Sequence, residues 1–173
     1  MVLLTGWLVV TQSAPLAFSV GGEGGVGFTR PVGDTVVLGL DQLVLADPGR
    51  RVQLLGARVE GSGMDPRVAR NDGVRAYEVG PAGGIGAITA DELDGRESGV
   101  PGGWTLAEPA GVVIRAGHRW GLVLVVTGLR EGRWSSDGLV VDYLVDGKRS
   151  SQRFDVHVAV CVADVTVLCE SDE

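Results

Sequence analysis

The clearest pattern of apolar and polar positions is a pair of β-rich runs, Leu139–Val145 and Lys148–Val162, which meet at Asp146-Gly147. Asp-Gly between such runs predicts a two-residue type I′ turn, because both central positions of that turn need positive φ. A register centred on the turn puts sensible neighbours together on both faces of the hairpin. It places Tyr143 opposite Ser150, Leu139 opposite Phe154 and Asp142 opposite Ser151.

The chain from residue 33 onward repeats this rhythm of short β-rich runs bounded by turns. Further strands are expected near residues 34–45, 51–60, 74–79, 84–89, 112–114, 120–127 and 165–169. Two long polar loops, Gly61–Gly73 and Ala90–Gly103, interrupt them. No run has the length and period of a helix. The pattern therefore predicts an all-β fold, an antiparallel β-sandwich of about eight or nine strands.

The N-terminal run Val2–Val10 is apolar and has the length of a signal-peptide core, and Ser13–Ala17 supplies small residues at a cleavage distance. The first basic residue is Arg30, so the positive flank of a signal peptide is missing. Three interpretations stay open: the tail of an anchor or signal that begins upstream, an atypical signal, or a first buried strand. The run alone is too short to span a bilayer.

A glycine-rich stretch follows and contains a formal G-x-G-x-x-G at Gly22, Gly24 and Gly27. A dinucleotide site needs a helix directly after these glycines, whereas Pro31 and Gly33 interrupt the next turns. We therefore interpret the stretch as a linker. The predicted organisation is an anchor-like segment plus linker (or first strand) over residues 1–27, and a β-sandwich domain over residues 28–173.

Composition and charge exclude some classes of binding partner. The chain has 173 residues, 28 of them glycine, and a net charge of −7. This length suffices for one domain with its own core. The acidic balance argues against nucleic acid and against an anionic membrane surface, both of which attract basic proteins. Lys148 is the sole lysine beside fourteen arginines, which is typical of a high-GC genome.

Several of these features together resemble small immunoglobulin-like extracellular domains that are anchored to the membrane of high-GC Gram-positive bacteria. They are the pattern Leu106-x-x-Pro109-x-Gly111-x-x-Ile114-x-x-Gly117, the long apolar strand, Val-x-Tyr143-x-Val-Asp-Gly147, and a closing strand that ends in Cys161. The resemblance covers residues 28–169 and implies an immunoglobulin-like fold, a surface location and a non-catalytic role. The resemblance does not identify any functional residue in this chain.

The residues that carry chemistry are few. The two histidines are His118, in a turn, and His157, in the closing strand. A small hydrolase could use His157 with Asp155 or Asp142 and a loop serine, but no motif for a nucleophile or metal supports it. The acidic loop 91–97 does not match a calcium-binding loop, and the histidines and cysteines lack zinc spacing. No catalytic residue, metal or cofactor is predicted.

Three functions remain. The first is a non-catalytic module of the cell envelope or extracellular space that binds a protein or glycan through Gly61–Gly73 and Ala90–Gly103, since long loops on rigid scaffolds often carry function. The second is the hydrolase that uses His157. The third is a subunit of a larger surface assembly. Any contact with a membrane would come only through the N-terminal segment.

The two cysteines yield a first testable prediction. Cys161 and Cys169 have the same strand parity and enclose residues 162–168, a span that a short hairpin closes within disulfide distance. In an exported domain such a pair is normally oxidised, whereas in a cytosolic one both would be buried thiols. Mass spectrometry without reductant should find the protein lighter by the two thiol hydrogens. Two free thiols in protein made in an oxidising compartment would contradict this and weaken the argument for export.

Overall fold

The structure is a computed structural model that describes residues 17–18, 24–80, 85–90 and 104–164. These residues form eleven strands. Their bounds are β1 Gly24–Arg30, β2 Thr35–Leu43, β3 Val52–Glu60, β4 Ala69–Glu78, β5 Ala87–Thr89, β6 Val113–Ile114, β7 Trp120–Gly128, β8 Gly132–Ser136, β9 Gly138–Val145, β10 Lys148–Phe154 and β11 Val156–Val162.

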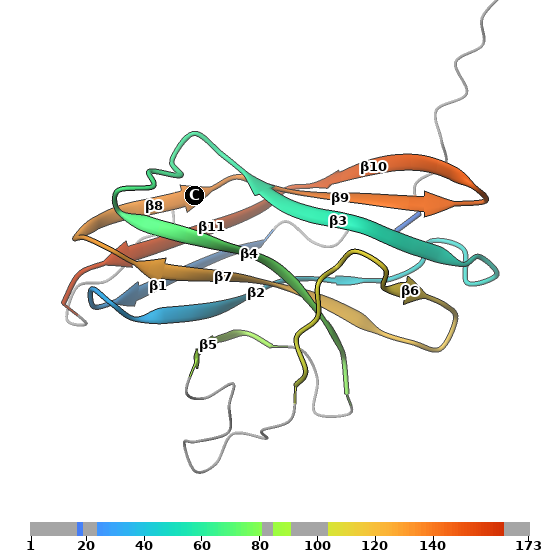
Figure 1. The fold of residues 1–173 in the computed structure, drawn as a ribbon, viewed down its shortest axis with the longest axis horizontal. Coiled ribbons are helices and arrows are strands. Elements are labelled where there is room, and N and C mark those ends of the chain that lie inside the picture. Colours follow the sequence, from blue (N-terminus) through green and yellow to red (C-terminus); the bar gives the residue numbers. More distant parts are fainter. Residues whose placement is uncertain (1–16, 19–23, 81–84, 91–103, 165–173) are drawn as a thin grey trace, which may run out of the picture.

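The strands lie in two layers (Figure 1). One layer is the antiparallel sheet β4-β7-β2-β5. The other contains the sheets β10-β9-β3-β6 and β1-β11-β8, which are joined because β8 runs into β9 and β10 runs into β11. The predicted all-β, antiparallel β-sandwich is confirmed, although the described residues hold eleven strands rather than eight or nine.

The topology is immunoglobulin-like. In that fold the second, fifth and fourth strands share one sheet, and the third, sixth and seventh share the other. When β8–β9 and β10–β11 are each taken as one long strand, the sheet β4-β7-β2 and the sheet β10-β9-β3 reproduce this division. The strand β1 adds to the second layer in parallel with β11, which is a departure from a wholly antiparallel arrangement.

The hairpin predicted at Asp146-Gly147 is confirmed. The two turn residues have φ of 52° and 73°, as a type I′ turn requires. The register pairs Tyr143 with Ser150 and Leu139 with Phe154. Farther from the turn the register shifts, because Val158 pairs with Ser136. One extra residue therefore lies on the returning strand between Phe154 and Val158, which is the geometry of a β-bulge.

Several segments expected as loops or linkers belong to strands. The glycine-rich stretch enters the sandwich at Gly24 as β1, so the boundary drawn after residue 27 falls inside a strand. The loop expected over Gly61–Gly73 ends at Ala69, where β4 begins, and Gly73 lies at a register shift of β4 with φ of 100°. The loop expected over Ala90–Gly103 and the strand expected at 165–169 lie almost wholly outside the described residues.

The core lies between the layers and is mostly aliphatic. The strand β7 contributes Leu122, Leu124 and Val126, which are fully buried, in agreement with its nearly unbroken apolar sequence. The strands β8–β9 and the returning strands β10–β11 form one long hairpin. Trp134 of β8 and Tyr143 of β9 are the largest side chains that this long hairpin buries in the core. No helix among the described residues is long and apolar enough to cross a membrane.

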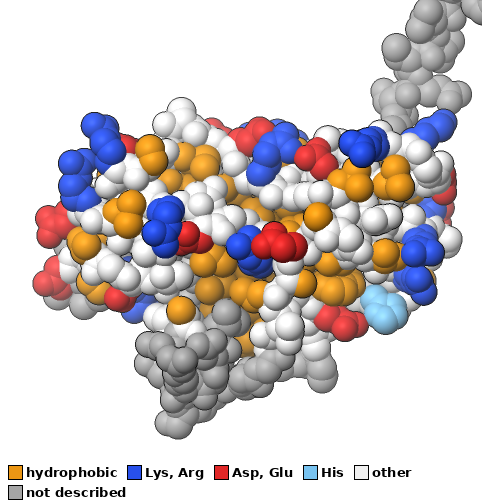
Figure 2. Space-filling model, in the orientation of Figure 1, with side chains coloured by type: hydrophobic (Ala, Val, Ile, Leu, Met, Phe, Trp, Pro, Cys, Tyr) orange, Lys and Arg blue, Asp and Glu red, His pale blue; other side chains and the backbone are white. Residues whose placement is uncertain are grey.

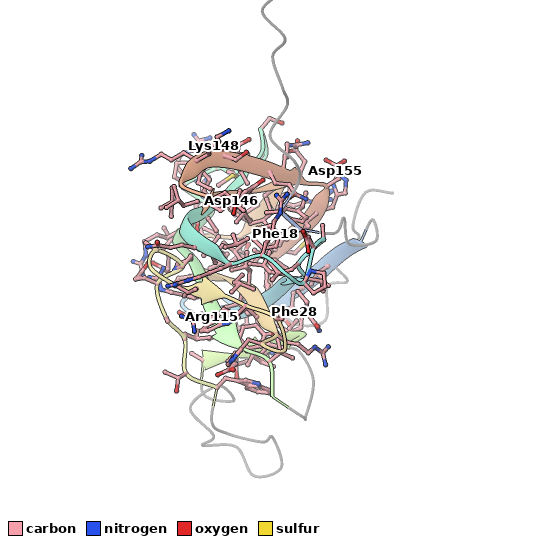
Figure 3. The ribbon with its side chains drawn as sticks, turned by 90° about the vertical axis from the view of Figure 1, so that its right-hand side faces the viewer. Phe18, Phe28, Arg115, Asp146, Lys148 and Asp155 are labelled. Atoms are coloured by element: carbon pink, nitrogen blue, oxygen red, sulfur yellow. The ribbon has the colours of Figure 1, made fainter. Side chains whose placement is uncertain are left out.

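Part of the N-terminal segment also belongs to this core. Phe18 is 1% exposed, and its ring meets Tyr143 edge-on at a centroid distance of 5.4 Å (Figure 3). Its backbone N–H donates to Gln152 Oε1 at 3.2 Å, and its carbonyl accepts from Gln152 Nε2 at 3.0 Å. On the other side Phe18 forms an isolated antiparallel bridge with Leu45. Ala17 and Phe18 therefore pack at the edge of the sandwich, between β10 and the residues that follow β2.

This docking predicts a large cost for removing the Phe18 ring. Phe18→Ala should lower the free energy of unfolding by about 3 kcal/mol, since it empties a buried aromatic site. Val32, which is 52% exposed, provides the control: Val32→Ala should stay within about 0.5 kcal/mol of wild type. Urea denaturation measures both. Equal stability of Phe18→Ala and wild type would show that the segment does not dock.

Candidate functional site

A polar pocket lies where the loop after β3 meets the outer face of the long hairpin. It has a volume of about 150 Å³. The loop contributes Gly61, Ser62 and Gly63, and the hairpin contributes residues of β8 and β11. The lining residues of the hairpin are Arg133, Ser135, Ser136, Asp137, His157, Val158 and Ala159.

Two glycines bring the loop against β8. A Cβ atom on Gly61 would lie 2.8 Å from the Cα atom of Ser136, which is closer than real Cβ contacts. A Cβ atom on Gly63 would collide with Ser135, whose backbone N–H donates to the Gly63 carbonyl at 3.0 Å. The close approach of the two backbones thus needs glycine at Gly61, whereas a side chain at Gly63 would have to displace the Ser135 hydroxyl. From the sequence, these glycines were expected only as part of a loop.

Polar residues of the hairpin face outward beside the β-bulge, following the regular alternation of β8 and β11. Continuing the register of β8 and β11 by one residue puts His157 opposite Asp137. Both side chains are exposed, whereas the inward-facing Trp134 and Val158 are buried. Ala159 lies opposite Ser135 and leaves room between the two ends of the pocket. The pocket therefore offers hydroxyl, imidazole, carboxylate and guanidinium groups around a floor of small side chains.

Hydrogen bonds between Asp65 and Arg67 stabilise the loop after β3. The backbone N–H of Arg67 donates to Asp65 Oδ1 at 2.9 Å, and its guanidinium donates to Asp65 Oδ2 at 2.8 Å. The carbonyl of Asp65 accepts the N–H of Val68 at 3.0 Å. The side-chain hydrogen bond from Arg67 lowers the pKa of Asp65 to about 2.

The residues considered for a hydrolase do not come together as a triad. His157 lies in the pocket and, among the described residues, has no hydrogen-bond or ion-pair partner. Asp155 pairs with Arg153 at 2.8 Å. Asp142 pairs with Arg58 at 2.6 Å and also accepts from Ser151. Each candidate carboxylate is thus held by an arginine instead of orienting the imidazole.

Sequence reasoning missed Ser135, Ser136 and Arg133 as members of a site. The Ser136 hydroxyl is buried and has no hydrogen-bond partner. Only the segment's polarity, Arg133-Trp-Ser-Ser-Asp137, could have marked these positions, and such composition is equally typical of a turn. On the face drawn in Figure 2, basic and acidic side chains are interspersed instead of gathering by sign.

The sequence offered two further sets of candidate metal ligands, the cysteines for zinc and the acidic loop 91–97 for calcium. Cys161 lies in β11 opposite Arg133 on one side and Thr29 on the other. Cys169 lies outside the described residues, so the Cys161–Cys169 disulfide stays a prediction. The acidic loop 91–97 also lies outside them. In the part of the chain that the structure describes, no group of three or more His, Cys, Asp or Glu side chains could hold a metal ion.

Comparison with known proteins adds no assignment of family. No family model and no curated protein matches the chain. Among solved structures, the ASH/PapD-like domain 7 of human CEP192 is 12% identical with a TM-score of 0.41, over 95% of this chain and 100% of that one. The CooA pilin subunit from enterotoxigenic Escherichia coli is 14% identical with a TM-score of 0.35, and the match covers 80% of this chain and 90% of that one. Neither score is high enough to support a function.

The Asp65–Arg67 pair predicts a pH-dependent contribution to stability. Because the pKa of Asp65 is lower in the folded protein than its usual 3.8, the contribution is present above about pH 4. It is lost as the pH falls through about 2. Asp65→Asn should therefore lower the melting temperature slightly at pH 7, and the difference from wild type should shrink between pH 4 and pH 2.

Arg67→Gln serves as the matched variant, since it removes the other half of the same pair. Its difference from wild type should follow the same pH profile, and the double variant should show less than the sum of the two losses. Thermal melting followed by circular dichroism measures all of them. A difference that stays constant from pH 7 to pH 2 would contradict the role of the ionised carboxylate.

Proposed function

We propose that the protein is a non-catalytic interaction module of the cell envelope or extracellular space, and that it binds a protein or glycan partner through the polar pocket and the loop 61–68. The observation that carries the proposal is that the loop after β3 packs against β8 and forms one wall of the pocket. Gly61 and Gly63 let the loop press directly on β8, so the exposed groups of β8 and β11 stand in a recess of fixed shape.

The chemistry of the pocket suits recognition by hydrogen bonds. Serine hydroxyls both donate and accept, Arg133 donates, and Asp137 accepts. Asp137 is already partly neutralised by Arg153, whose Nη2 lies 3.4 Å from its carboxylate. A pocket of about 150 Å³ is smaller than the usual site for a complete small molecule. It fits one group of a larger partner, such as a sugar ring of a glycan or a polar side chain of a protein.

An exposed position on the loop allows a direct test. Ser62→Trp should fill the pocket without touching the core, because Ser62 is exposed and lines the pocket. Labelled protein should bind a glycan array or the surface of cells of its natural host, and Ser62→Trp should reduce that binding at least tenfold. Lys148→Trp, beside the hairpin turn at the other end of the molecule (Figure 1), should bind as wild type does.

Two outcomes would overturn the proposal. Equal binding by Ser62→Trp and wild type would place the contact elsewhere. Turnover of an ester or glycoside that His157→Ala abolishes, at an unchanged melting temperature, would make the protein a hydrolase. His157 is exposed, so its replacement should otherwise change stability by no more than about 0.5 kcal/mol.

A further inference from the structure

An apolar groove lies at the end of the sandwich opposite the polar pocket. It has a volume of about 280 Å³ and lies between the segment after β2 and the turn before β7. Leu43, Val44, Leu45 and Pro48 line one side, and residues 115–119 line the other. In Figure 1 the turn before β7 lies at the right-hand end, whereas β8 and the loop after β3 lie at the left.

The groove is open to solvent and has an exposed hydrophobic side chain. Val44 is 54% exposed, one of three large hydrophobic residues with such exposure in the described part of the chain. Folding does not require it there, since it contributes little to the core. Exposed apolar surface beside a concave wall is typical of a contact site for another molecule.

The rim of the groove is basic. Arg115 and Arg119 both line it and are exposed, and none of the described lining residues is acidic. Among the described residues the Arg115 guanidinium has no hydrogen-bond or ion-pair partner. Arg119 donates to the neutral Gln42 at 2.7 Å. Among the lining residues that the structure describes, His118 alone has an acidic partner, Glu78, at 3.0 Å. Two full positive charges thus flank the groove in a chain whose net charge is −7.

We propose that this groove binds an acidic peptide segment of a partner protein, with an apolar side chain of the segment against Val44 and its carboxylates at Arg115 and Arg119. Charge complementarity selects the acidic segment, since guanidinium groups pair with carboxylates through two parallel hydrogen bonds. The volume selects a peptide over a lipid tail, because the groove holds one or two side chains as anchors of an interface.

The test uses the full chain and an acetylated, amidated peptide Glu-Trp-Leu-Glu as the probe, with binding followed by fluorescence anisotropy of the labelled peptide. Val44→Ser and the double variant Arg115→Gln/Arg119→Gln should each weaken binding at least tenfold. Two matched controls should bind as wild type does: Val32→Ser, at a valine that is 52% exposed, and Arg149→Gln, at an exposed arginine of β10. Melting temperatures confirm that each variant is folded.

Four results would overturn the inference. The first is equal binding of the peptide by wild type and both groove variants. The second is equal affinity for the peptide Lys-Trp-Leu-Lys, which would remove the charge argument. The third is binding of phosphatidylglycerol vesicles, but not of the peptide, through the same residues, which would assign the groove to a membrane. The fourth is a dimer in sedimentation that Val44→Ser dissociates, which would make a second copy the occupant.

Discussion

The rest of the structure depends on the long hairpin formed by β8–β9 and β10–β11 and on the one extra residue in its returning strand. Inward-facing residues have even numbers in β8 (Trp134 and Ser136) but odd numbers in β9 (Leu139 and Tyr143). The returning strands keep even numbers inward throughout. A hairpin of constant register would turn one half of its apolar residues to solvent, because side chains alternate with a period of two. The bulge removes this conflict, so both halves of the hairpin contribute to one core.

The polar pocket lies beside the same irregularity. At the bulge His157 and Asp137 face outward on neighbouring strands, and β8 presents Ser135 beside them. The loop after β3 can approach this point because Gly61 lacks a side chain that would meet the backbone of Ser136, and Gly63 one that would meet the Ser135 hydroxyl. Bulges often occur where a strand must redirect a side chain toward a site. The register shift that serves the core and the candidate contact residues therefore lie at the same point of the hairpin.

The buried side chain of Gln152, at the edge of the same hairpin, also needs hydrogen-bond partners. Its inward direction on β10 would bury an amide without partners, which is costly in a core. The backbone of Phe18 supplies both a donor and an acceptor, so the amide is satisfied while the Phe18 ring fills the space against Tyr143. The short N-terminal segment and the buried amide are thus stable only together. The two candidate contact sites lie at opposite ends of the sandwich.

The local sequence was sufficient for those features that depend on neighbours along the chain. Asp146-Gly147 determined its own turn and the pairing of Tyr143 with Ser150, because backbone conformation and alternation act over a few residues. The apolar run at residues 120–127 likewise predicted a strand, which the structure confirms as β7. Other features needed partners far along the chain. The glycines of β1 become a strand because β11 supplies hydrogen bonds, and Phe18 becomes core because Gln152 and Tyr143 lie beside it. His157, Ser135 and Gly63 form a pocket only where the bulge and the loop meet, and no local pattern records such a meeting.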